Sequence, residues 1–146
     1  MKRIANYWSK WRLLPESTKI NFLYASVTLV IIKIGLTLLP FQSFRKLFHK
    51  ISRSEQREDM TSVEINEIVY AINTLATILP FELLCLPRAL AAKYLLRKVP
   101  SLSLEIGIEM NRNKDFEAHA WVEKDGNVII GDWSESVFYQ RLWVWE

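Results

Sequence analysis

Apolar residues recur every three or four positions through two long stretches in the first half of the chain. One stretch runs from Ser17, which is suited to cap a helix, to the residue before Pro40. The other begins with Thr61 and Glu64 at the spacing of a capping box and ends at Pro80. A shorter basic stretch, residues 41–53, is amphipathic with the same period. This pattern predicts three helices.

A further helix is expected to start near Cys85 and to run to about Lys98, because Pro100 follows. The apolar period then falls to two, which is typical of a half-buried strand. The alternating residues are Leu102, Leu104, Ile106, Ile108 and Met110. Residues 117–123, 127–132 and 137–145 are expected to form three more strands. Helices followed by antiparallel strands indicate an α+β fold, in which the helix bearing the cysteine packs on an antiparallel sheet.

The charge is divided unevenly along the chain. Residues 1–53 hold ten Lys and Arg but only one acidic residue, a net charge of +9, whereas the remainder has a net charge of −6. The polar run SEQREDM, residues 54–60, lies between the two parts. We therefore expect a basic helical N-terminal module over residues 1–56 and a second domain over residues 57–146.

The apolar interior of the first long helix, residues 20–39, has the length of a membrane span. Lys33 near its middle opposes insertion, since a central charge costs about 2.5–3.5 kcal/mol. We therefore expect this helix to pack within the protein, with a transmembrane helix as the alternative. The single cysteine excludes an internal disulfide and suggests the cytoplasm. Neither zinc-binding nor phosphate-binding motifs occur, so no metal or cofactor is expected.

The dipeptide Asp125-Gly126 lies between two predicted strands and is the strongest short signal for a tight hairpin turn. If these two residues form the turn, Lys124 pairs with Asn127 and each later pair follows in step. His119 then lies opposite Asp132, and Trp121 lies opposite Ile130. Opposed residues share a face of the sheet, so the register predicts an imidazole beside a carboxylate.

The only cysteine, Cys85, stands at the predicted start of a helix. The positive end of a helix dipole and an adjacent imidazolium both favour the thiolate, which is the nucleophilic form. Unbonded N–H groups at the helix start are also placed to stabilise an oxyanion. A helix carrying Cys85 and a hairpin carrying His119 and Asp132 match the arrangement in papain-like and transglutaminase-like enzymes.

Structural roles are the alternative for each of these residues. A lone cysteine is usually a small buried apolar residue, and Asp132 alternatively caps the loop after its strand. Arg88, one turn after Cys85, binds a substrate carboxylate or pairs with a structural acid such as Glu82. Trp121 contacts substrate, shields the catalytic pair from water, or belongs to the core. His49, in the basic helix, is expected to be solvated.

Two runs, CLPRALAAKYLL and FEAHAWVEKDGNVI, followed by an aspartate, resemble the transglutaminase-like cysteine proteases of lasso-peptide biosynthesis. The resemblance covers about residues 60–146, and the helical N-terminal part is similar in pattern only. It implies that Cys85 is the nucleophile, His119 the base and Asp132 the orienting acid, without a cofactor. These enzymes remove the leader from a ribosomally made precursor peptide.

The same resemblance implies partners. A separate leader-recognition protein would deliver the precursor, and a macrolactam synthetase would close the ring on the amine that cleavage exposes. The basic module would bind these partners, acidic leader residues or an anionic membrane. No nucleic-acid partner is expected, because the basic module has Tyr7, Trp8 and Trp11 but no recognisable nucleic-acid-binding fold signature. Two other functions stay open at this point. One is a transamidase on the same scaffold, and the other is a membrane-associated adaptor with an inert Cys85.

Overall fold

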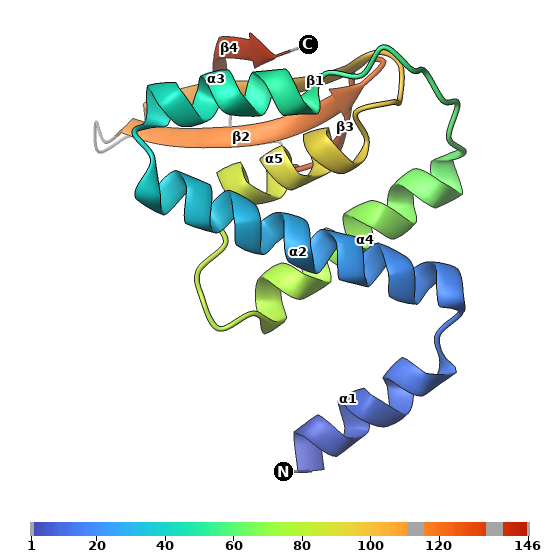
Figure 1. Cartoon of the computed structure of the whole chain (residues 1–146). Helices are drawn as coiled ribbons and strands as arrows, with labels where there is room; N and C mark the ends of the chain where they lie inside the picture. The colour runs from blue at the N-terminus through green and yellow to red at the C-terminus, as the bar shows by residue number, and fades with distance from the viewer. Residues whose placement is uncertain (1, 111–115, 134–138, 146) are drawn as a thin grey trace.

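A computed structural model describes residues 2–110, 116–133 and 139–145, and these form five helices and one four-stranded antiparallel sheet (Figure 1). The expected α+β class is therefore confirmed. The helices are α1 (Lys2–Leu13), α2 (Glu16–Leu38), α3 (Phe41–Ser52), α4 (Ser62–Ile78) and α5 (Cys85–Leu95). The strands are β1 (Leu102–Met110), β2 (Phe116–Lys124), β3 (Asn127–Ile130) and β4 (Gln140–Trp145).

The helix ends follow local chemistry, with two corrections to the sequence prediction. The capping box of α4 is present, since Thr61 accepts from the Glu64 N–H and the Glu64 carboxylate accepts from the Thr61 N–H. Ser17 was expected to cap α2, but the N-cap is Pro15, two residues earlier, whose fixed φ suits an entry into a helix. α5 ends at Leu95 rather than near Lys98, because the chain tightens into a turn at Leu96.

The sheet has the strand order β3-β2-β1-β4. The predicted hairpin turn is confirmed, because Asp125 and Gly126 both have positive φ and Lys124 pairs with Asn127. The register then shifts between Glu123 and Val122, and Val122 pairs with Ile130. The predicted pairing of Trp121 with Ile130 is therefore wrong. A bulge inserts one extra residue into β3, which sequence alternation cannot reveal.

One apolar core joins the helices to the sheet. α5 lies between the sheet and the pair formed by α2 and α4 (Figure 1). Ala25 and Leu29 of α2, Leu90 of α5, and Leu104 and Val122 of the sheet belong to the same buried cluster. This core includes residues from both sides of the boundary expected near residue 56. The division into two domains stays a prediction.

α2 is the one helix among the described residues that is long and apolar enough to cross a membrane by length and composition. Its neighbour α3 packs closely against it at Gly35. A Cβ there would lie 2.8 Å from the ring of Phe44, so a larger residue would push α3 away. The linker beyond α3 is held to the body, since the Glu58 N–H donates to the Lys98 carbonyl and the two side chains form an ion pair.

Candidate active site

Cys85 is the first residue of α5, as the sequence predicted. The preceding Leu84 has extended backbone and provides no side-chain cap, so the first N–H groups of the helix have no side-chain acceptor from the N-cap residue. The backbone N–H groups of Leu86 and Ala120 face the half-buried Cys85 sulfur and help to lower the pKa of the thiol. The thiol therefore lies where the N-terminus of α5 meets β2.

His119 of β2 is the side chain that meets this sulfur, through a hydrogen bond between the two side chains. The ring's Nε2 lies 2.5 Å from the carbonyl oxygen of Gly131. A carbonyl only accepts, so Nε2 carries a hydrogen and Nδ1 is left to exchange a proton with Cys85. This is the arrangement that a thiol–imidazole pair needs.

The two groups change each other's acidity. The hydrogen bond with His119 lowers the pKa of Cys85 from its usual value, and this outweighs the opposing effect of burial. The hydrogen bond with Cys85 raises the pKa of His119, and the Gly131 carbonyl raises it further. Both shifts favour a thiolate beside an imidazolium, the reactive state of cysteine proteases and transglutaminase-like enzymes.

Asp132 does not contact His119 Nε2, although the predicted register had implied this contact. β3 ends at Ile130, and the bulge moves the later residues by one position. The Asp132 side chain is exposed and, among the described residues, makes no hydrogen bond or ion pair. The Gly131 carbonyl takes the place at Nε2 that the sequence gave to Asp132.

Gly131 is the functional residue that sequence reasoning missed. Its φ is +85°, and a Cβ would lie 2.7 Å from the Ala120 carbonyl oxygen and 3.0 Å from the Trp121 backbone. Only glycine therefore allows this turn to approach β2 and to present its carbonyl to His119. The available signal was a glycine directly after an apolar strand, which often marks positive φ.

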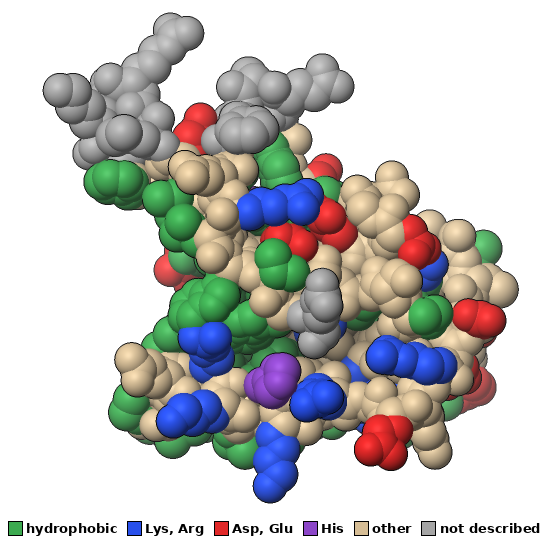
Figure 2. Space-filling view, turned by 90° about the horizontal axis from the view of Figure 1, so that it is seen from above, with side chains coloured by type: hydrophobic (Ala, Val, Ile, Leu, Met, Phe, Trp, Pro, Cys, Tyr) green, Lys and Arg blue, Asp and Glu red, His purple; other side chains and the backbone are tan. Residues whose placement is uncertain are grey.

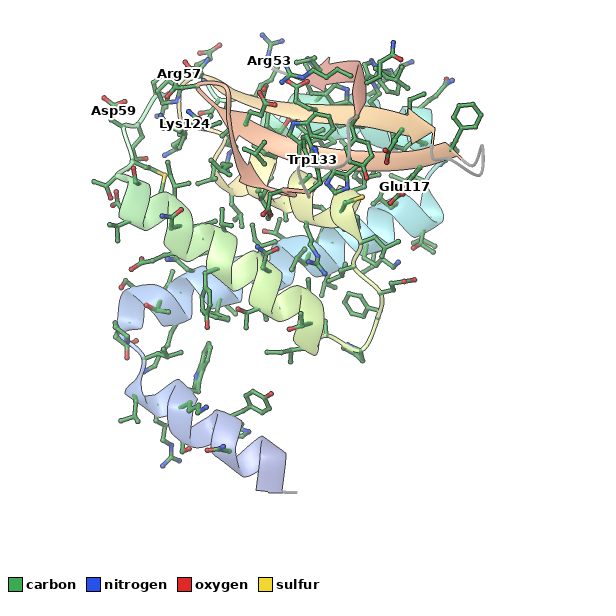
Figure 3. All side chains as sticks on the ribbon, turned by 180° about the vertical axis from the view of Figure 1, so that it is seen from behind. Arg53, Arg57, Asp59, Glu117, Lys124 and Trp133 are labelled. Carbon is green, nitrogen blue, oxygen red and sulfur yellow. The ribbon has the colours of Figure 1, made fainter. Side chains whose placement is uncertain are left out.

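Three aromatic rings surround the His119 imidazole. Tyr139 stacks on it at a centroid distance of 4.9 Å, Trp121 lies at 6.1 Å, and Trp133 meets it edge-on at 5.7 Å. Trp133 lies near the end of the sheet where α5 begins (Figure 3). Trp121 is only 1% exposed, so it has no free surface for a substrate. The structure favours its role as a shield of the catalytic pair.

A polar network lies behind Trp121 on the same face of the sheet. The indole N–H donates to the buried carboxylate of Glu123, which also accepts from Arg141. Arg141 is 3.8 Å from the buried carboxylate of Glu105, whose other oxygen accepts from Ser103. This network fixes the Trp121 ring and therefore the wall behind His119.

A second glycine, Gly107, makes room for the Trp121 ring. A Cβ on Gly107, which pairs with His119 across the sheet, would lie 2.8 Å from the Trp121 ring. The β1–β4 register shifts at this position, so Gly107 also coincides with a bulge beside the site. Gly107 thus lies against the Trp121 ring, whereas Gly131 lies against the Cα and Cβ of Trp121.

Arg88 has a structural contact rather than an acidic partner. Its Nε donates to the Leu83 carbonyl at 2.8 Å, and the side chain is half-buried. This bond ties the segment before α5 to the first turn of the helix, and so it supports the position of Cys85. Binding of a substrate carboxylate by Arg88 stays a prediction. His49 is exposed on α3, as expected.

The donors of this site suit acid–base and nucleophilic chemistry rather than metal binding. Throughout the described part of the chain, no group of three or more His, Cys, Asp and Glu side chains is placed to hold a metal ion. A sulfur, an imidazole and several backbone N–H groups instead converge at the start of α5. Such a set supports acyl transfer through a thioester.

Comparison with protein families agrees with this geometry. A family model described as the Transglutaminase-like superfamily matches residues 26–144. The chain belongs to the transglutaminase-like superfamily. Cysteine proteases and transglutaminases make up most of this superfamily, so the expected papain- or transglutaminase-like core is confirmed at that level. No curated protein and no solved structure matches the chain.

Proposed function

We propose that this member of the transglutaminase-like superfamily is a thiol endopeptidase that removes the leader from a lasso-peptide precursor. The observation that carries the proposal is the hydrogen bond between Cys85 at the start of α5 and His119 on β2. The two sequence runs around these residues support the choice of substrate, because they resemble those of lasso-peptide leader peptidases.

The proposed reaction uses the pair in two steps. The Cys85 thiolate attacks the carbonyl carbon at the leader–core junction, and the His119 imidazolium donates its proton to the leaving nitrogen as the C–N bond breaks. The core leaves with a free amine, and the leader stays on Cys85 as a thioester. Water, deprotonated by His119, then attacks the thioester and releases the leader carboxylate and the thiol.

The first turn of α5 is the proposed oxyanion site. Its N–H groups lack a side-chain cap, and the backbone N–H of Leu86 already points toward the sulfur. In the tetrahedral intermediate, the carbonyl oxygen of the leader would approach these donors. The aromatic rings around His119 exclude water on the other side and strengthen these electrostatic interactions.

The proposal includes two partners. A separate recognition protein holds the leader and presents the junction to Cys85, and a macrolactam synthetase uses the amine that cleavage exposes. The cytoplasm is the proposed compartment, since the thiolate must stay reduced.

The test follows leader release from the precursor by mass spectrometry, in the presence of the recognition protein. Cys85→Ala and His119→Ala should abolish release, whereas His49→Ala should release the leader at the wild-type rate because His49 is exposed on α3. Release at the normal rate by the Cys85→Ala protein would exclude Cys85 as the nucleophile.

The orienting group has two candidates, and one variant separates them. Asp132→Asn removes the carboxylate that the sequence resemblance assigns to this role, while the Gly131 carbonyl at Nε2 is retained. Unchanged turnover would assign the orientation of His119 to Gly131. A loss of several orders of magnitude would assign it to Asp132, and would require the turn at residues 131–133 to change when substrate binds.

A transamidase is the second candidate, because the superfamily includes transglutaminases. It would pass the acyl group from Cys85 to an amine instead of water. The mass of the acyl product distinguishes the two reactions, since only hydrolysis yields a free carboxylate on the leader. A leader joined to the added amine would overturn the peptidase proposal.

A further inference from the structure

α2 exposes a continuous apolar stripe along its outer face. Seven large side chains on this stripe are between 49% and 75% exposed. They are Ile20, Leu23, Tyr24, Val27, Ile31, Ile34 and Leu38. Their spacing of three or four residues places them on one side of the helix, over about 27 Å of its length. Apolar patches of this extent mark sites of protein or membrane contact.

The opposite face of α2 is part of the core. Ala25 and Leu29 are fully buried, and Ile32 is 5% exposed. The Lys33 Nζ donates to the Glu82 carbonyl, which ties α2 to the segment before α5. Crossing a bilayer would remove this face from α4 and α5. The helix is therefore placed to lie along a surface rather than to span a membrane.

α1 precedes α2 in the chain and, like α2, lies below the sheet in Figure 1. Among the residues whose side chains are described, it carries the exposed Lys10 and Arg12, and its sequence has no acidic residue. Tyr7 and Trp8 are 60% and 63% exposed. Trp11 meets Phe22 of α2 edge-on at 5.9 Å, and Phe22 belongs to the inner face of α2, where it packs against the core and Tyr70 of α4. Tyrosine and tryptophan favour the boundary between lipid headgroups and acyl chains, and cations favour anionic headgroups.

We propose that α1 and the outer stripe of α2 lie on an anionic membrane surface. A membrane fits better than a protein partner because the apolar stripe lies on a convex helix that directly follows a helix whose cations no acidic residue of α1 balances. Lys and Arg side chains also gather over α3 (Figure 2), but that helix lies above α2, beside the sheet (Figure 1). They therefore belong to a different surface.

This orientation leaves the sheet on the side away from the membrane, because α1 and α2 lie below the sheet in Figure 1. His119 and its aromatic neighbours would thus face the aqueous phase. A precursor peptide would reach the catalytic pair without entering the lipid. The membrane proposal stands on α1 and α2 alone and does not depend on the proposed peptidase activity.

The test is flotation of the purified full chain with vesicles of two compositions. One set is phosphatidylcholine alone, and the other contains about one part phosphatidylglycerol to three parts phosphatidylcholine. The protein should float with the anionic vesicles and stay in solution with the neutral ones. High salt should release it, as expected for a surface-bound helix pair.

Matched variants locate the contact. Val27→Ser with Ile31→Ser, both at exposed stripe positions, should lower partitioning about tenfold or more without unfolding the protein. Lys10→Gln with Arg12→Gln should weaken binding to anionic vesicles by a similar factor. Leu47→Ser on α3 is the control, because this residue is 51% exposed but lies on the other surface.

Three results would overturn the proposal. The first is that the wild-type protein does not float with anionic vesicles at low salt. The second is that Val27→Ser with Ile31→Ser binds vesicles as well as the Leu47→Ser control. The third is that sedimentation shows a stable dimer that the stripe variant dissociates, with no vesicle binding, since the stripe would then be a contact between two copies of the chain.

Discussion

The side chains of Cys85 and His119 form a hydrogen bond that joins the first residue of α5 to the middle of β2. These residues are far apart in the sequence and come together because β3 ends at Ile130. The ladder between β2 and β3 covers only residues 122–124 of β2. The N–H of Ala120 is therefore available to the sulfur, and the start of α5 fits against β2 beside it.

The first prediction concerns the pH dependence of thiol reactivity. Because His119 lowers the pKa of Cys85, alkylation by iodoacetamide should remain fast at a pH well below the usual thiol range. The rate of peptide cleavage should rise as Cys85 loses its proton and fall as His119 loses its own. The fall in the cleavage rate at high pH should occur above the pH range in which histidine usually titrates, because the pKa of His119 is raised.

The control for this prediction is His119→Ala. Without the imidazole, the midpoint of alkylation should move upward toward that of an ordinary thiol, since the largest cause of the lowered pKa is lost. His49→Ala should leave the midpoint unchanged. An identical midpoint in the wild-type and His119→Ala proteins would contradict the pairing of the two groups.

The second prediction compares two glycines with positive φ. Gly126 has φ +79° and nothing within 4 Å of an added Cβ, whereas Gly131 has φ +85° and a Cβ there would meet the Ala120 carbonyl. Gly126→Ala should cost about 1 kcal/mol of the free energy of unfolding. Gly131→Ala should cost about 2–3 kcal/mol and lower kcat/KM about a hundredfold.

Urea unfolding and steady-state kinetics measure both effects. The ratio of kcat/KM between the two variants is informative, because both glycines have a similar positive φ and only the Gly131 carbonyl contacts His119. Equal activity in the Gly131→Ala and Gly126→Ala proteins would show that the Gly131 carbonyl does not position His119.

The third prediction concerns Arg88, whose Nε donates to the Leu83 carbonyl. Arg88→Lys should lower the free energy of unfolding by about 1–2 kcal/mol and reduce kcat, because the segment before Cys85 loosens. KM should stay the same. The exposed Arg57→Lys is the matched control. An increase in KM at unchanged stability would instead indicate that Arg88 binds a substrate carboxylate.

The fourth prediction concerns the polar network around Arg141. Glu105 and Glu123 are 3% and 6% exposed, so loss of Arg141 leaves buried carboxylates with fewer partners. Arg141→Gln should lower the free energy of unfolding by about 1–3 kcal/mol. Lys98→Gln breaks the more exposed pair with Glu58 and should cost less than about 1 kcal/mol. Similar costs for both variants, measured by urea unfolding, would contradict the structural role of the network.

Most of the fold was predictable because its signals are local. The capping box at Thr61, the period-two alternation from Leu102 and the Asp125-Gly126 turn each depend on a few adjacent residues. The predicted cap at Ser17 was wrong because the helix is capped two residues earlier, at Pro15. Local signals placed the helices and strands but left their ends uncertain by a few residues.

The site was predictable in part. The position of Cys85 at a helix start and of His119 on a strand follows from apolar patterning, and the structure brings the two together. The hydrogen-bond partner of His119 Nε2 could not be predicted from the sequence, because it depends on a bulge in β3 and on a backbone carbonyl. A carbonyl has no sequence signature, since every residue has one.

The sequence by itself determined the elements, the α+β class, the hairpin turn and the two residues with thiol–imidazole chemistry. Only the tertiary structure decided the register beyond the bulge, the acceptor at His119, the aromatic enclosure and the buried face of α2. The physical reason is the distance along the chain over which each interaction acts. Propensity, capping and turn chemistry act between neighbours in the chain, whereas register, acidity and burial depend on which distant surfaces meet when the core forms.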